Sequence, residues 1–138
     1  MDLTASNEFA VLYAKAWCSH DPERVAAFFA EDGSLTINDG PAAVGRQAIA
    51  EVARGFMKAF PDLEVTMDDL VRTDDEPHWT GFQWTLTGTN IGPGGSGKRV
   101  RISGHELWRL DDAGFIRDSR GYFDTAEYER QLKYGVAG

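Results

Sequence analysis

The sequence predicts a single α+β domain in which helices cover one face of a curved antiparallel sheet. Up to Phe60, apolar side chains recur at three- and four-residue spacing, which is typical of amphipathic helices. From Leu63 onward, apolar and polar residues alternate, as they do in half-buried strands. Helices followed by strands favour helices segregated on one side of the sheet. The chain has the length of one domain and contains no internal repeat or linker, so residues 1–138 are expected to fold as one unit.

Two helices are predicted at the start of the chain. Thr4 or Ser6 can cap the first helix, which should end near Ser19. Its apolar stripe consists of Phe9, Leu12, Tyr13, Ala16 and Trp17. The second helix begins at Asp21, because a capping side chain is followed there by Pro22 and by an acid in the first turn. Its buried side is formed by Val25, Phe28 and Phe29, and residues 31–33 should end it.

A short strand and a third helix come next. Residues 34–37 are predicted to form the strand, and residues 38–41 contain the Asn, Asp, Gly and Pro that are typical of a turn. Helical spacing of apolar residues returns from Arg46 to Phe60. Pro61 cannot continue a helix and ends this one.

Four consecutive strands should follow, at residues 63–67, 79–90, 99–110 and 115–123. Turns are expected at 74–77 and 111–114, where Asp, Gly and Pro gather. Because side chains alternate across a strand, Glu106 and Trp108 should share one face and His105 should lie on the other. Thr125 is predicted to cap a short final helix that extends through Leu132, and Asp124 beside it also has a capping role available.

The composition excludes several classes of protein. The net charge of −8 disfavours binding to nucleic acids and to anionic membranes, since both require clustered Lys and Arg. A lone Cys18 cannot form an intramolecular disulfide, and no leader-like segment opens the chain, so a cytoplasmic location is expected. The three histidines and Cys18 lack the spacing of metal ligands, and no metal site is predicted.

A glycine-rich stretch at 92–98 resembles the start of a phosphate-binding loop. Arg99 stands at the eighth position, where such loops have Ser or Thr, and strand residues follow instead of a helix. A phosphate cradle needs the N-terminus of a helix, so a loop at the mouth of a pocket is the favoured interpretation.

The chain resembles the nuclear transport factor 2-like superfamily, and its second half is most similar to SnoaL-like polyketide cyclases. The resemblance is carried by AVLYAKAWCSHDPERVAAFFAEDGSL, GRQAIAEVARGF, TGTNIGPGGSGKRVRISGHELWRL and FIRDSRGYFDTAEYERQL. It implies a cone-shaped fold with a curved antiparallel sheet packed against three N-terminal helices. It also implies an apolar pocket and a homodimer formed through the outer face of the sheet. Isomerases, hydrolases, cyclases and binding proteins all share this fold, so the fold alone does not define the chemistry.

The resemblance also suggests catalytic residues. In ketosteroid isomerases a tyrosine and an acid donate hydrogen bonds to the substrate oxygen, and these align with Tyr13 and Glu106. The aspartate that shuttles the proton in those enzymes aligns with Ile37, and Asp39 lies two residues further on. A key aspartate of the SnoaL-like cyclases falls on Gly121, and a histidine that assists it falls on Trp108.

Alternatives remain for each of these residues. Glu106 either faces a dry cavity, which would raise its pKa, or points outward and pairs with Arg101 or Arg117. Tyr13 either donates to a ligand or is an ordinary core tyrosine. Arg120 pairs either with an acid such as Asp118 or with a ligand anion.

Three functions are therefore compatible with the sequence. The first is a cofactor-independent cyclase or isomerase that acts on a small hydrophobic carbonyl compound of polyketide or steroid-like character. Glu106 and Tyr13 would polarise the substrate oxygen, and Asp39 would move the proton. The others are a binding protein with the same pocket but no catalysis, and a dimerisation module. The expected pocket residues besides the catalytic ones are Trp17, Phe28, Phe56, Phe60, Trp84, Trp108, Arg120 and Phe123.

Overall fold

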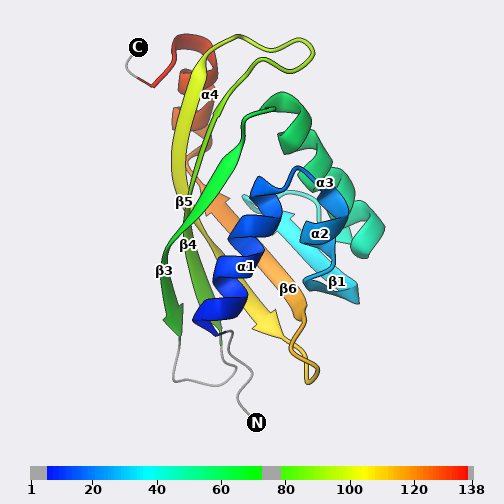
Figure 1. Cartoon of the computed structure of the whole chain (residues 1–138). Coiled ribbons are helices and arrows are strands. Elements are labelled where there is room, and N and C mark those ends of the chain that lie inside the picture. The colour runs from blue at the N-terminus through cyan, green and yellow to red at the C-terminus, as the bar shows by residue number, and fades with distance from the viewer. Residues whose placement is uncertain (1–5, 73–78, 137–138) are drawn as a thin grey trace.

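The computed structural model describes residues 6–72 and 79–136 and has the α+β architecture that the sequence predicts. The helices are α1 (Asn7–Cys18), α2 (Pro22–Ala26), α3 (Arg46–Ala59) and α4 (Thr125–Tyr134). The strands are β1 (Phe29–Ile37), β2 (Ala43–Val44), β3 (Glu64–Arg72), β4 (Thr80–Thr89), β5 (Arg99–Leu110) and β6 (Ile116–Phe123). Figure 1 shows α1, α2 and α3 on one side of a curved sheet, with α4 near the end of the long strands. The expected turn at 74–77 lies outside the described residues.

The sheet is mixed, whereas the sequence predicted an antiparallel one. Its strand order is β2-β1-β6-β5-β4-β3, and β1 runs parallel to β6 while the other neighbours are antiparallel. β1 precedes α3 and the run of four strands in the sequence. The chain therefore comes back beside β1 only at its last strand, β6, after a long connection. Alternation within each strand cannot reveal the direction of such a distant partner.

β1 also begins earlier than expected, because Phe29 belongs to the strand and not to the second helix. Phe29 pairs with Ile116, and the N–H of Ile116 donates to the carbonyl of Phe28 at 2.9 Å. The register between β1 and β6 shifts between Phe29 and Ser34, an interval that contains Gly33. A Cβ atom at Gly33 would lie 2.8 Å from the carbonyl oxygen of Ile116, so the close approach of the two strands requires glycine there.

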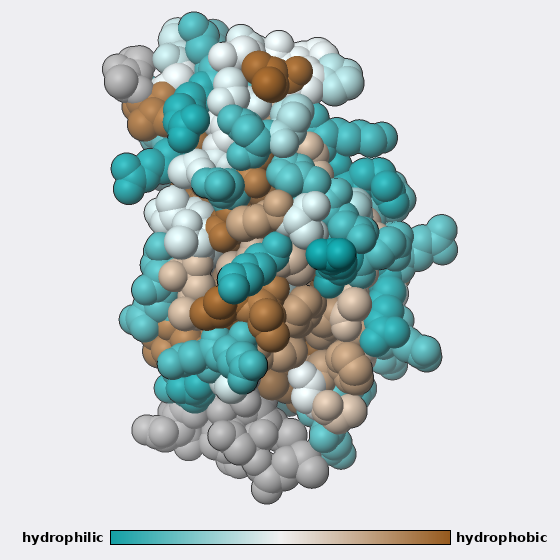
Figure 2. Space-filling view, in the orientation of Figure 1, coloured by the Kyte–Doolittle hydropathy of each residue, from teal (hydrophilic) through white to brown (hydrophobic). Residues whose placement is uncertain are grey.

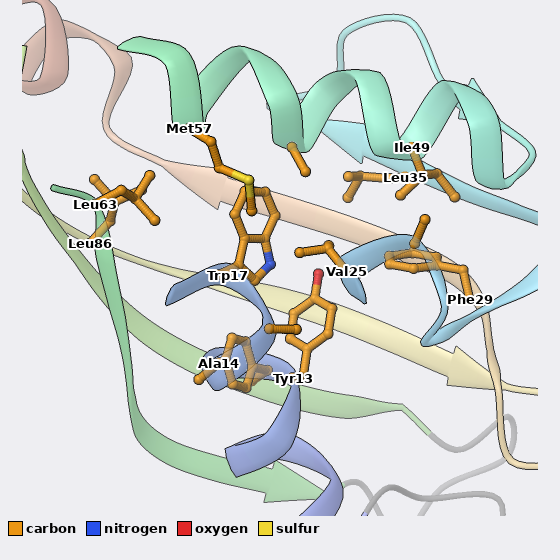
Figure 3. Close-up of a cluster of buried hydrophobic side chains, with 14 of the residues drawn as sticks. Tyr13, Ala14, Trp17, Val25, Phe29, Leu35, Ile49, Met57, Leu63 and Leu86 are labelled. Atoms are coloured by element: carbon orange, nitrogen blue, oxygen red, sulfur yellow. The ribbon is translucent and has the colours of Figure 1, made fainter. Parts of the chain in front are cut away.

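The core fills the space between the helices and the inner face of the sheet. From α1 it receives the buried Ala10, Tyr13, Ala14, Ala16 and Trp17. Figure 3 shows Tyr13 and Trp17 projecting from α1 toward side chains of α3 and β1. Leu12 was expected in this stripe but is 47% exposed, since it lies beside Val11 on the outer side of the helix. Figure 2 shows apolar surface in the middle of the face that α1 crosses.

The glycine-rich loop packs against the C-terminal end of α3. Gly92 donates to the carbonyl of Ala59 at 3.2 Å, and the side-chain amide of Asn90 donates to the same oxygen. A Cβ atom at Gly92 would overlap the carbonyl oxygen of Lys58, so glycine is needed for this contact. None of the loop residues lines the principal pocket. No helix in the described part of the chain is long and apolar enough to cross a membrane.

Candidate active site

The principal pocket lies between the inner face of the sheet and helices α1, α3 and α4. It has a volume of about 60 Å³. The lining residues are Trp17, Leu35, Ile37, Phe56, Val65, Trp84, Leu86, Ile102, Glu106, Gly121, Phe123 and Tyr128. Glu106 is the single ionisable carboxyl group in an otherwise apolar and aromatic wall. Such a wall with one convergent polar group is typical of small-molecule sites.

The strand register explains why the pocket forms at this point of the sheet. Glu106 on β5 pairs with Phe82 on β4 and with Gly121 on β6. In the neighbouring row, Gly104 stands between Trp84 and Phe123. Gly121 thus leaves a gap beside Glu106 in a face that otherwise carries large side chains, whereas the indole of Trp84 covers Gly104.

Three side chains donate hydrogen bonds to the Glu106 carboxylate. The Ser119 hydroxyl donates to Oε1 at 2.7 Å, and the Trp108 indole N–H donates to Oε1 at 3.0 Å. The Tyr13 hydroxyl donates at 3.0 Å to Oε1 and at 3.3 Å to Oε2. These donors come from β6, β5 and α1. Oε1 is therefore saturated, whereas Oε2 keeps free capacity for another hydrogen bond or a proton.

Burial dominates the electrostatics of the site. Glu106 is only 8% exposed, and loss of hydration raises the pKa of its carboxyl group although the hydrogen bonds from Trp108, Ser119 and Tyr13 lower it. The pKa of Tyr13 is raised well above its usual value, first by burial and then by the charge of Glu106, while a hydrogen bond from Trp17 partly offsets both. Figure 3 shows the nitrogen of Trp17 and the hydroxyl of Tyr13 facing each other. The linked residues fix one carboxyl group in a dry environment that suits acid-base chemistry.

The structure brings together part of the predicted site. Trp17, Phe56, Trp84 and Phe123 line the pocket together with Glu106. Tyr13 and Trp108 are fully buried behind Glu106 and act on it through hydrogen bonds. His105 is exposed on the outer face, where its ring lies 5.3 Å from that of Tyr122.

Two of the expected lining residues belong to other parts of the core. The ring of Phe28 packs edge-on against Tyr13 with centroids 5.5 Å apart, and Phe28 is not among the lining residues. Phe60 is fully buried and its ring lies 6.4 Å from that of Tyr128. Phe60 therefore supports a lining residue without lining the pocket itself.

Asp39 and Arg120 lie on the surface. Asp39 occupies a left-handed turn with φ of 59° and accepts a hydrogen bond of 3.3 Å from the Tyr122 hydroxyl. Arg120 is exposed, with its Nε 3.6 Å from a carboxylate oxygen of Asp118 and its guanidinium over the ring of Trp79. Neither side chain is among those that line the pocket.

Besides the lining residues Leu35, Val65, Leu86, Ile102 and Tyr128, the sequence did not identify Ser119. It is fully buried and makes the shortest hydrogen bond to Glu106. Serines are frequent on surfaces, so its type gives no signal. Its position does, because Ser119, Gly121 and Phe123 alternate on one face of β6. Within residues 6–72 and 79–136, no three His, Cys, Asp or Glu side chains gather in a way that could hold a metal ion.

Comparisons with known proteins agree with this architecture. The family model described as SnoaL-like polyketide cyclase matches residues 7–132. A protein with a ketosteroid isomerase-like fold from Catenulispora acidiphila, solved with trimethylamine, superposes with a TM-score of 0.78 at 19% identity, covering 93% of this chain and 94% of its own. SalBIII, an epoxide hydrolase/cyclase-like enzyme of pyran ring formation in salinomycin, superposes with a TM-score of 0.73 at 18% identity, covering 86% of this chain and 90% of its own.

A third solved structure is a candidate polyketide cyclase from Xanthomonas campestris, with a TM-score of 0.66 at 21% identity over 91% of this chain and 94% of its own. No curated protein sequence matches the chain significantly. At these identities the solved structures establish the fold, whereas the chemistry has to be argued from the site itself.

Proposed function

This chain belongs to the SnoaL-like polyketide cyclase family, and on that premise we propose that its pocket binds a small hydrophobic carbonyl compound and that Glu106 transfers a proton there. The observation that supports this most directly is the buried carboxyl group of Glu106 in an apolar pocket, with a raised pKa and a full set of donors. A carboxyl group with a pKa nearer to neutrality both accepts and returns a proton efficiently.

Each donor around Glu106 has a positioning role in this proposal. Because the Tyr13 hydroxyl already donates to Glu106, it orients the carboxylate and does not need to reach the ligand. Ser119 and Trp108 hold Oε1, which leaves Oε2 to exchange the proton. Asp39 is not required, since one carboxyl group can take a proton from one position of the ligand and return it to another.

Deuterium exchange tests this function without knowledge of the natural substrate. Cyclohexanone is a small ketone that exchanges its α-hydrogens slowly in water. The wild-type protein in deuterated buffer should accelerate incorporation of deuterium, as measured by NMR. Glu106→Gln should lower the rate by roughly 10²–10⁴-fold, the usual contribution of a general acid or base. Glu64→Gln changes an exposed carboxyl group on β3 and should retain the wild-type rate. Equal exchange by wild type and Glu106→Gln would refute proton transfer by Glu106.

A non-catalytic binding protein is the second candidate. Ile37 and Gly121 both line the pocket, and they occupy the positions at which related enzymes are expected to carry acids. This candidate predicts that cyclohexanone binds while its α-hydrogens exchange no faster than in buffer.

A further inference from the structure

The indole N–H of Trp84 is a buried donor on a residue that lines the pocket. Its Nε1 is shielded from solvent, and within the described residues it has no hydrogen-bond partner. Trp84 is one of the lining residues. Native structures rarely leave a buried donor unsatisfied, and where they do, a functional explanation is warranted.

Packing fixes the indole of Trp84 in place. The ring crosses Gly104 on the neighbouring strand, where a Cβ atom would lie only 2.6 Å from Cζ2 of the indole. On the next strand, Phe123 meets the indole edge-on with ring centroids 6.0 Å apart. A ring held on both sides cannot easily turn to find a partner within the protein. The N–H is therefore preorganised for an acceptor that the described residues do not supply.

Trp84 and Glu106 lie on the same face of the sheet in adjacent rows. Trp84 pairs with Gly104, and Glu106 is two residues further along β5. The backbone positions of such diagonal neighbours lie roughly 7–8 Å apart, so the two side chains border the same part of the pocket. A ligand carbonyl group and its α-carbon can be placed between them, with the oxygen on the indole side and the C–H bond on the carboxylate side.

We propose that the Trp84 indole N–H donates to the carbonyl oxygen of the ligand and thereby selects for carbonyl compounds, while Glu106 requires that they carry an α-hydrogen. The proposal rests on the function assigned to Glu106 above. Oε2 of Glu106 takes the α-proton, and the C–H electrons form a carbon–carbon double bond. The carbonyl π electrons move to the oxygen, where the Trp84 N–H stabilises the negative charge. Return of the proton from Glu106 to a carbon of the enolate regenerates a ketone and the carboxylate.

Indole nitrogen NMR with a matched pair of probes tests the contact directly. The Trp84 N–H signal is assigned from its loss in Trp84→Phe and is followed while cyclohexanone or cyclohexane is added to the full-length protein. Cyclohexanone should move this signal downfield, as expected for a new hydrogen bond, whereas cyclohexane should not. Trp84→Phe should weaken the binding of cyclohexanone by about tenfold and leave the binding of cyclohexane unchanged, because only the ketone loses a hydrogen bond. Trp79→Phe removes an indole from the outer face and serves as the control, with wild-type binding expected.

The outcomes separate this inference from the function on which it rests. The inference is overturned if the Trp84 N–H signal does not respond to cyclohexanone. It is also overturned if Trp84→Phe weakens the binding of cyclohexanone and of cyclohexane equally. Exchange of α-hydrogens that depends on Glu106 but is unaffected by Trp84→Phe also overturns it, while leaving proton transfer by Glu106 intact. A downfield shift in a protein that catalyses no exchange supports the contact with Trp84 and places the pocket in a binding protein.

Discussion

The Ser119 hydroxyl donates to Oε1 of Glu106 at 2.7 Å, so a small side chain of β6 stabilises the buried carboxyl group of β5. Both residues point to the inner face of the sheet, one row apart along the two strands: Glu106 pairs with Gly121, and Ser119 pairs with Trp108. Trp108 donates to the same oxygen, so the pair Ser119 and Trp108 grips one side of the carboxylate. The other oxygen, Oε2, accepts the longer hydrogen bond of 3.3 Å from the Tyr13 hydroxyl.

Replacing Ser119 by alanine should therefore raise the pKa of Glu106 further. The hydrogen bond stabilises the ionised form, and its loss favours the protonated one. The variant should also lose about 1–3 kcal/mol of unfolding free energy, because a buried charged acceptor loses a donor. Carbon-13 NMR of the Glu106 carboxyl group measures the pKa. Ser103→Ala removes an exposed serine hydroxyl that pairs with Thr85, and no change in the pKa of Glu106 is expected there.

Because the pKa of Glu106 is raised, its contribution to the stability of the protein should decrease as the pH rises. In the folded state the carboxyl group holds its proton above the ordinary value of 4.5, so the folded state binds more protons than the unfolded chain. The stabilisation is complete below the unfolded pKa and is lost as pH rises through the folded pKa. Each unit of pKa difference corresponds to about 1.4 kcal/mol.

Urea unfolding of wild type and Glu106→Gln at pH 5 and pH 8 measures this effect. Glutamine cannot ionise, so the variant does not lose this stabilisation. The unfolding free energy of Glu106→Gln, relative to that of the wild type, should therefore increase as pH rises. The lowered pKa values of Asp62 and Glu127 act in the opposite direction, but they contribute equally to both proteins. A difference that stays constant between the two pH values would show that Glu106 does not titrate abnormally.

The fold was predictable from the sequence because each helix and long strand carries a local signal. The cap at Asp21, for example, accepts from the N–H of Glu23 as its residue type predicts. The parallel pairing of Phe29 with Ile116 joins residues far apart in the chain, and no local pattern encodes it. The same distance effect hid part of the site, since Ser119 becomes important only when β5 and β6 are in register.

A dimer remains a prediction from the family resemblance. His105 lies exposed on the outer face of the sheet, where a second copy would cover it. His105→Glu should then shift the protein toward the monomer in sedimentation experiments, because burial of an unpaired charge is costly. Gln47→Glu adds the same charge at an exposed position of α3 and should leave the association state unchanged. A wild-type protein that sediments as a monomer at all concentrations would contradict the prediction.

Gly121 and Gly104 should differ sharply in their tolerance of a methyl group, because Gly121 borders the pocket and Gly104 is covered by the indole of Trp84. At Gly121 a Cβ atom would lie 3.6 Å from Cγ of Glu106, an ordinary contact, so Gly121→Ala should fold with wild-type stability. The added methyl group would fill part of the space beside Glu106 and should weaken cyclohexanone binding and slow α-exchange.

Gly104→Ala instead places its methyl group against the indole of Trp84 and the backbone carbonyl of Tyr122. The indole is held by Phe123 and the carbonyl belongs to a paired strand, so neither can yield easily. We expect a loss of about 1–3 kcal/mol or more in urea unfolding, as is usual for overpacked cores. If Gly104→Ala were as stable as Gly121→Ala, the indole of Trp84 would have to be free to move away from Gly104, and it would no longer be a fixed donor for the ligand.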